Sequence, residues 1–101
     1  LKLGGAQQRV NDWEPAFHRN QRPQPISSDE LCKSLGKYYV KAIELFGPER
    51  CMFESNFPVD KECVSYRTLW NFFKKISIEM NLSKADKDSV FSETAKLVYR
   101  L

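Results

Sequence analysis

The sequence predicts a small, mostly α-helical chain with one or two short strands. Three long stretches place apolar residues at helical spacing, and two short apolar runs are bounded by turn residues. In chain order the expected elements are a strand at 1–5, a loop at 6–26, a helix at 27–46, a strand at 50–54, and helices at 62–80 and 84–99. A chain of 101 residues has room for one small hydrophobic core, so we expect one domain.

The expected helix at 27–46 has a recognisable start and stop. Ser27 and Glu30 fit a capping box, in which a hydroxyl and a carboxylate satisfy exposed amides of the first turn. Gly47 and Pro48 end the helix. Its apolar residues recur at spacings of three and four and predict one buried stripe: Leu31, Leu35, Tyr38, Ala42 and Leu45.

The other elements are predicted from the same kinds of sequence signal. The helix at 62–80 carries a wide apolar stripe: Tyr66, Leu69, Trp70, Phe73, Ile76 and Met80. A second capping sequence, from Ser83 to Asp86, starts the helix at 84–99. The run at 50–54 is short and apolar, as strands of parallel sheets are. In the loop at 6–26, three prolines interrupt any helix.

Composition argues against several classes of function. The net charge of +3 is spread along the chain, no glycine-rich phosphate loop is present, and too few basic residues flank the aromatic ones to form a nucleic-acid groove. No apolar run reaches the roughly 20 residues that span a bilayer. Three cysteines without a CxxC pair favour reduced thiols. We therefore expect a cytoplasmic protein that binds neither nucleic acid nor membrane. Because it starts at Leu1 rather than Met, we expect the chain to be a processed or truncated product.

The stretch FGPERCMFESNFPVD, residues 46–60, resembles the last barrel strand of family 2 amidohydrolases, which typically reads fGxxRxxfGSDfP. The matching residues are Phe46, Gly47, Arg50, Phe53, Ser55, Phe57 and Pro58. The end of the chain is similar to the family's TAxxxYxL tail, with Thr94, Ala95, Tyr99 and Leu101. The resemblance implies an α/β fold in which this chain is the C-terminal part of a (β/α)8 barrel of about 250 residues. It also implies a hydrolase for a lactone or another carboxylate-bearing small molecule.

The resemblance implies a metal as well, but not one held by this chain. Members of the family bind a divalent metal through a His-x-His on the first strand and further histidines midway. Here His18 is the sole histidine. We therefore expect no metal site and no cofactor in this chain, while a metal such as zinc could be held by a full-length parent.

Three polar residues near the end of the 50–54 strand are the candidate catalytic groups. Asn56 stands where most family members place the aspartate that activates water. An amide cannot accept that proton, so Asn56 either positions water or substrate by hydrogen bonds or caps the turn after the strand. Glu54 and Asp60 are the nearby carboxylates. The alternative for both is an ordinary ion pair, with Lys61 or Arg50 as the partner.

The candidate substrate-binding residues are His18, Trp13 and Phe17. They lie in the loop at 6–26, which in the family's barrel would approach the mouth of the active site. The alternative is that His18 is a surface residue without a function. Cys51 lies in the expected buried strand, where a thiol behaves as a small apolar group rather than as a nucleophile.

Two functions from different classes remain open at this point. The first is a portion of a hydrolase, inactive in isolation because a barrel enzyme draws its reacting groups from several strands. The second is a stand-alone helical protein-interaction module with no catalytic activity. The intact mass of the protein, compared with the length of its reading frame, discriminates the two.

The first testable prediction concerns assembly. Without neighbouring strands, the strand at 50–54 would leave unpaired backbone edges, and the helices would leave apolar surface exposed. We expect self-association to a dimer or larger species in analytical ultracentrifugation. A monomer of 11.8 kDa at all concentrations would contradict the prediction.

Overall fold

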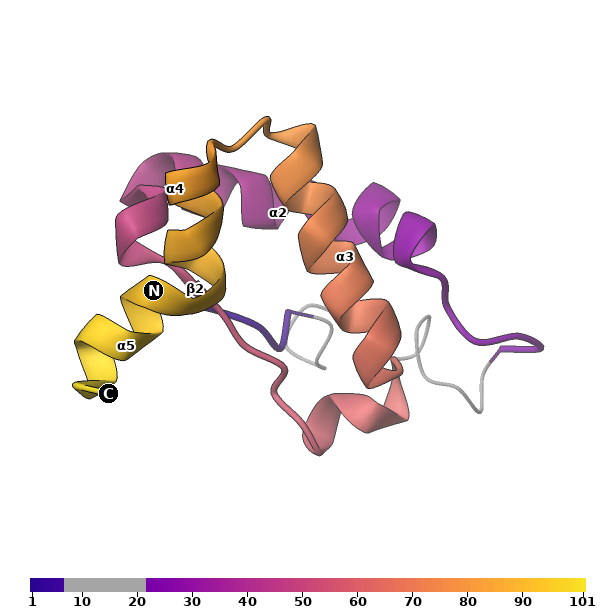
Figure 1. The fold of residues 1–101 in the computed structure, drawn as a ribbon. Coiled ribbons are helices and arrows are strands. Elements are labelled where there is room, and N and C mark those ends of the chain that lie inside the picture. The colour runs from indigo at the N-terminus through magenta and orange to yellow at the C-terminus, as the bar shows by residue number, and fades with distance from the viewer. Residues whose placement is uncertain (7–21) are drawn as a thin grey trace.

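The computed structural model describes residues 1–6 and 22–101, in which helices pack around a small parallel sheet (Figure 1). In chain order the elements are β1 (Lys2–Leu3), α2 (Ser28–Phe46), the 3₁₀ helix η3 (Pro48–Arg50), β2 (Met52–Phe53), the 3₁₀ helix η4 (Val59–Glu62), α3 (Tyr66–Glu79), α4 (Lys84–Asp88), the π-helical segment η5 (Ser89–Glu93) and α5 (Thr94–Tyr99). The described part is thus mostly helical with two short strands, consistent with an α/β fold. Among its helices, none is both long enough and apolar enough to cross a membrane.

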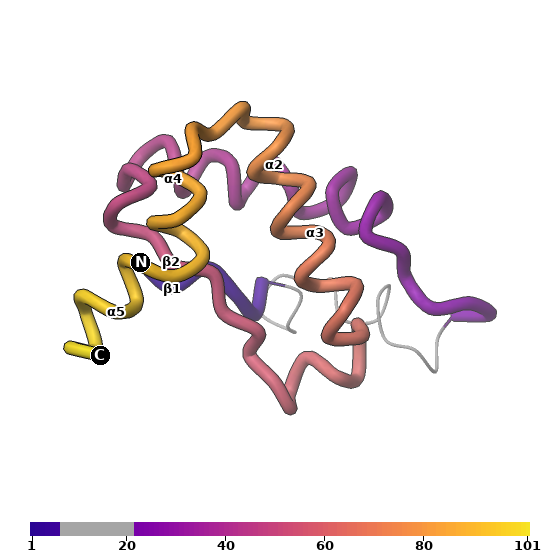
Figure 2. The backbone as a smooth tube through the Cα atoms, in the orientation of Figure 1, coloured from indigo at the N-terminus to yellow at the C-terminus, as the bar shows by residue number. Residues whose placement is uncertain are grey.

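The sheet consists of β1 and β2, which run parallel although they are far apart in sequence. Lys2 is paired with Met52 and Leu3 with Phe53. Helix α2 connects the two strands, since a parallel pair needs a crossover and cannot be joined by a tight hairpin. Figure 2 shows the strands side by side at the centre, with α3 on one side and α4 and α5 on the other. The ends of both strands therefore lie at the same edge of the sheet.

Helix α2 begins at the predicted cap. The Ser27 hydroxyl accepts a hydrogen bond from the Glu30 backbone N–H at 3.1 Å. The Glu30 carboxylate forms an ion pair with Arg22. At the other end, Gly47 adopts a positive φ of 86° and its N–H donates to the Ile43 carbonyl at 2.8 Å. Glycine populates this region without steric cost, which explains why the helix stops there.

The buried face of α2 differs from the predicted stripe. Its buried apolar residues lie four apart, at Leu31, Leu35, Tyr39 and Ile43. Tyr38 is 48% exposed and Leu45 is 69% exposed, so both predictions of burial were wrong. A row with a spacing of four follows one side of a helix closely, and here that row packs against α3 and the strands. The correction puts Tyr39 rather than Tyr38 in the core.

The second long helix starts later than predicted. The prediction extended the helix back to Glu62, but the structure places η4 at Val59–Glu62 and begins α3 at Tyr66. The Asp60 carbonyl accepts hydrogen bonds from the N–H groups of Cys63 and Val64, which closes a separate turn. Ser65 then caps α3 by accepting from the Thr68 N–H at 3.1 Å. A side-chain cap of this kind fixes the start of a helix.

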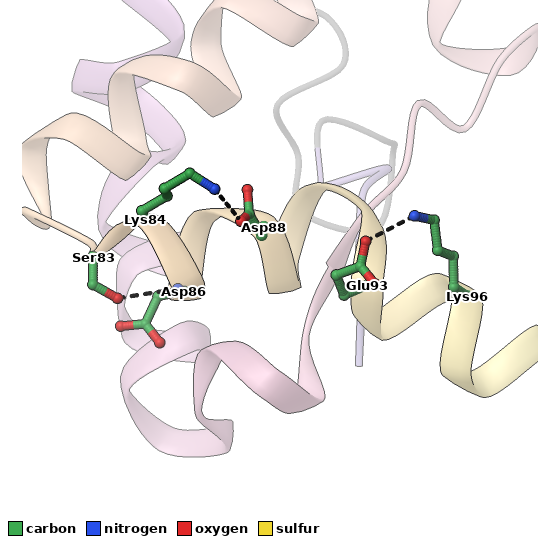
Figure 3. Close-up of polar contacts among 6 residues, drawn as sticks. All are labelled: Ser83, Lys84, Asp86, Asp88, Glu93 and Lys96. Carbon is green, nitrogen blue, oxygen red and sulfur yellow. Dashed lines mark hydrogen bonds and ion pairs between the residues drawn. The ribbon is translucent and has the colours of Figure 1, made fainter.

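The C-terminal helix contains a π-helical turn within the expected range of 84–99. Ser83 caps it by accepting from the Asp86 N–H at 3.1 Å, as Figure 3 shows. Two ion pairs lie along its exposed side, Lys84 with Asp88 and Lys96 with Glu93. Between them, η5 interrupts the α-helical bonding over five residues. The Thr94 hydroxyl donates to the Glu49 carbonyl at 3.1 Å, which holds this turn against η3.

Aromatic rings join the sheet to the helices in one core. The Phe53 ring on β2 is stacked on Phe73 of α3, with centroids 4.4 Å apart and 12° between the planes, and it also contacts Phe91 of η5 at 5.0 Å. Tyr39 meets Phe72 edge to face at 5.1 Å. Offset stacked and edge-to-face pairs add to the energy of burial. The position of β2 therefore depends on helices from both sides.

Replacement of Phe73 by Ala should be strongly destabilising. The ring is fully buried and contacts Tyr39, Phe53 and Trp70, so its loss leaves a cavity and should lower the free energy of unfolding by about 3–5 kcal/mol. Ile78 on the same helix is 68% exposed, and Ile78→Ala should change the free energy by less than about 0.5 kcal/mol. Urea denaturation of the two variants measures the difference. Equal losses would show that the core is not where the structure places it.

Candidate functional site

The candidate site lies where the chain leaves β1 and β2. Beyond the strands, the Glu54 N–H still donates to the Leu3 carbonyl at 3.1 Å, so the two segments stay together past the sheet. A Cβ added to Gly4 would lie 2.5 Å from the Glu54 carbonyl oxygen, and one added to Gly5 would lie 2.9 Å from Asn56 Nδ2. Gly5 also has a positive φ of 72°. Only glycine at both positions allows so close an approach.

Asn56 turns the chain away from β2. Its φ of 52° lies in the left-handed region, which asparagine tolerates better than most residues. Its side-chain Nδ2 donates to Asp60 Oδ1 at 2.7 Å, and its carbonyl accepts from the Asp60 N–H at 3.1 Å. Asn56 and Asp60, two of the candidate catalytic residues, are therefore joined by two hydrogen bonds.

Asp60 is fully buried, with 0% of its surface exposed. A buried carboxylate is stable only when hydrogen bonds or opposite charges compensate the loss of water. The Asn56 amide supplies one such bond. The pair therefore holds the Asn56 amide in one orientation.

Glu54 has a different partner from the ones expected. Its carboxylate forms an ion pair with Lys2 on β1 at 2.8 Å, not with Lys61 or Arg50. The hydrogen bond from Lys2 to Glu54 raises the pKa of Lys2. The Glu54 side chain is 30% exposed and that of Lys2 is 56% exposed, so the pair contributes little to stability. Its effect is to align the two strands at the site.

Tyr39 is a further polar group beside these residues, and the sequence prediction missed it. It is 4% exposed, and its hydroxyl is buried beside the Ala6 backbone. Burial raises the pKa of Tyr39, a hydrogen bond with the Ala6 backbone offsets part of that rise, and the carboxylates of Asp60 and Glu54 raise the pKa further. The spacing of four residues from Leu31 to Leu35 to Tyr39 was the sequence signal that could have predicted the burial of Tyr39.

The described residues do not form a metal site. Over 1–6 and 22–101, no group of three or more His, Cys, Asp or Glu side chains is placed to hold a metal ion. Asn56 and Asp60 offer one amide and one carboxylate, which is not a zinc donor set. Cys51 is buried, and burial raises the pKa of its thiol, so little reactive thiolate forms.

The three candidate substrate-binding residues, His18, Trp13 and Phe17, lie outside the described residues. Their proposed roles therefore rest on the sequence alone.

Comparison with known proteins shows which family and which relative the chain is similar to. A family model described as "Amidohydrolase" matches residues 1–101. The chain is also similar to "Uncharacterized protein y4mH" of Sinorhizobium fredii (strain NBRC 101917 / NGR234), with 42% identity over 69 residues. That match covers 68% of this chain but 23% of the relative's length. No solved structure matches the chain.

Substitutions at Asn56 should separate backbone strain from the hydrogen bond to Asp60. Asn81 has the same φ of 52°, so Asn56→Ala and Asn81→Ala should share a strain cost of roughly 1–2 kcal/mol. Asn56→Ala alone also removes a bond to a buried carboxylate, which should cost a further 1–3 kcal/mol, approximately. Asn56→Gly should recover the strain but not the bond. Urea denaturation that shows equal losses for both alanine variants would mean that the hydrogen bond contributes nothing.

Proposed function

The chain belongs to the amidohydrolase family, and on this premise we propose that it is the C-terminal portion of a hydrolase that acts on a lactone or another carboxylate-bearing substrate. The observation that carries the proposal is the Asn56–Asp60 pair at the end of β2, held at 2.7 Å beside the glycines that follow β1. These residues gather at one edge of a parallel sheet.

The topology supports this placement. In (β/α)8 enzymes the catalytic groups lie at the C-terminal ends of the strands, and neighbouring parallel strands are joined by a helix. Here α2 joins β1 to the parallel β2, the candidate catalytic residues follow the C-terminal end of β2, and Gly4 and Gly5 follow that of β1. The remaining strands of such a barrel would come from other parts of a parent protein. The chain covers 23% of the one relative described above, which leaves room for them.

The chemistry of the pair divides into two roles. In lactone hydrolysis water adds to the carbonyl carbon, the ring C–O bond breaks, and a hydroxy acid forms. Asn56 would hold the water or the carbonyl oxygen by hydrogen bonds, because an amide is both donor and acceptor but not a base. Asp60 orients that amide, and its carboxylate is the group bonded to Asn56 that can accept a proton. A catalytic role for Glu54 would require release from Lys2.

The partners proposed for the protein follow from this function. A small-molecule substrate would bind in the full-length parent, and a divalent metal there would need ligands from outside the described residues. Self-association and the lack of nucleic-acid binding stay predictions from the sequence.

One observation favours the alternative of a stand-alone interaction module. On α5, Leu97 is 78% exposed, Val98 is 56% exposed and Tyr99 is 53% exposed. Large apolar side chains that are exposed together can mark a contact with another protein surface. It equally fits a chain that packs on the rest of a larger protein. The intact mass of the natural protein decides between the two readings.

The proposed function predicts hydrolysis by the full-length protein. Proton release from γ-butyrolactone and δ-valerolactone, followed in a pH-stat, should show turnover, and Asn56→Ala should lower kcat by about tenfold or more, which corresponds to about 1.4 kcal/mol. Asn81→Ala is the control, since it has the same φ but lies at the end of α3. The 101-residue chain alone should be inactive. Turnover by that chain, or full activity of the folded Asn56→Ala protein, would contradict the assignment.

A further inference from the structure

A groove lies between the second half of α3 and the start of the C-terminal helix. Its volume is about 430 Å³, which is within the range of small-molecule sites. Figure 1 shows how the turn after α3 leads the chain back along α4, so that side chains from both helices border the groove. The lining residues are Lys74, Ser77 and Ile78 of α3, Lys87 and Asp88 of α4, and Phe91 of η5.

Two ammonium groups border this groove without a partner among the described residues. The chain from α3 to α5 contains five lysines. Three of them form ion pairs: Lys75 with Asp29, Lys84 with Asp88, and Lys96 with Glu93. The other two are Lys74 and Lys87, and within the described part of the chain neither ammonium group forms a hydrogen bond or an ion pair. Both of these unpaired cations line the one groove.

The other polar groups of the groove are already engaged. Asp88 is paired with Lys84 at 2.9 Å, so its charge is compensated by a residue that does not line the groove. The Ser77 hydroxyl donates to the Lys74 carbonyl at 2.7 Å. An anion in the groove would therefore be held by the two ammonium groups. Because the Asp88 carboxylate lies in the same groove, a second negative charge on the ligand would be repelled.

The remaining lining is apolar. Ile78 is 68% exposed, and the half-buried Phe91 ring is held in place by Phe53 at 5.0 Å and Trp70 at 6.2 Å. Covering exposed apolar surface of this kind is favourable in water. The ligand that fits these features has one carboxylate at one end and an apolar body at the other.

The groove beside β1 does not offer the same chemistry. It is lined by Lys2, but that ammonium group is already paired with Glu54 at 2.8 Å. The other side chains that line it are uncharged. Unpaired cations beside apolar surface are therefore a property of the groove at α3 and α4.

We propose that this groove binds a small amphipathic monocarboxylate, with the carboxylate held by Lys74 and Lys87 and the apolar body on Ile78 and Phe91. The site is separate from the Asn56–Asp60 pair. Lys74 lies eight residues beyond the start of α3 at Tyr66, about 12 Å along the helix axis, whereas Asp60 precedes that start. The inference is thus independent of the proposed function.

The test is a calorimetric titration of the full-length protein with 4-phenylbutyrate at low ionic strength. Replacement of both lysines, Lys74→Gln with Lys87→Gln, should weaken binding at least about tenfold, since each exposed ion pair contributes up to about fivefold. Ile78→Trp should abolish binding, because the larger side chain fills the groove. Lys41→Gln is the matched control, since it removes an exposed lysine on α2 that does not line the groove, and it should leave the affinity unchanged.

Further arms test the site and the ligand class. Asn56→Ala should bind 4-phenylbutyrate normally, and the neutral 4-phenylbutyramide and inorganic phosphate should both bind more weakly than the carboxylate. The urea midpoint of the double lysine variant should be unchanged, because neither ammonium group has a partner in the described fold. The inference would be overturned by absence of binding, by equal affinity of the double lysine variant, or by an amide or a phosphate that binds as tightly. Binding that is lost in Asn56→Ala but kept in the double lysine variant would place the probe at the strand ends and overturn it as well.

Discussion

Two backbone segments pass each other at close range just beyond β1 and β2, and the site depends on that approach. Gly4 packs against the Glu54 backbone and Gly5 against the Asn56 side chain, each closer than a Cβ would permit. The approach places the Asn56 amide between the glycines and the buried Asp60. It also brings the segment after β1 to Tyr39 on α2. A bulkier residue at either glycine would separate groups that come from three parts of the sequence.

The helices keep this edge of the sheet in place. The Phe53 ring is packed between Phe73 of α3 and Phe91 of η5, so β2 cannot shift without disturbing both. The Lys75 ammonium bridges α3 to the first turn of α2 through Ser28 and Asp29, each at 2.7 Å. Rigid support of this kind is what a site needs when its polar groups must stay aligned to within a fraction of an ångström.

The sequence was informative where local signals decide the structure, and less so where packing does. The start of α2 at Ser27 and its end at Gly47 could be predicted, since both depend on residues that are neighbours in sequence. The stripe on α2 was misplaced at Tyr38 because spacings of three and four fit neighbouring faces equally well, and packing against α3 selects one. The start of α3 was misplaced because the cap at Ser65 was overlooked and the turn before it is closed by backbone hydrogen bonds to Asp60.

The site was foreseen only in part, for similar reasons. The motif around Asn56 drew attention to the end of β2, but not to the contact with Asp60, which needs a left-handed backbone at Asn56. Glu54 could not be matched with Lys2 from sequence, since the two lie 52 positions apart and meet only through the parallel pairing of β1 and β2. Tyr39 was overlooked because packing against α3 selects it for burial in place of Tyr38.

The π-helical turn at Ser89–Glu93 bears on how this region tolerates insertions and deletions. In it the Thr94 N–H donates to the Ser89 carbonyl, five residues back, so the turn holds one residue more than an α-helix would. The wider turn takes five residues round about one turn where an α-helix takes about four, so removing one residue would restore regular bonding and leave the downstream helix facing nearly the same way. The bond from Thr94 to the Glu49 carbonyl and the direction of the exposed side chains on α5 would then be kept. The turn therefore absorbs one extra residue, and related chains that lack that residue would present the same C-terminal surface.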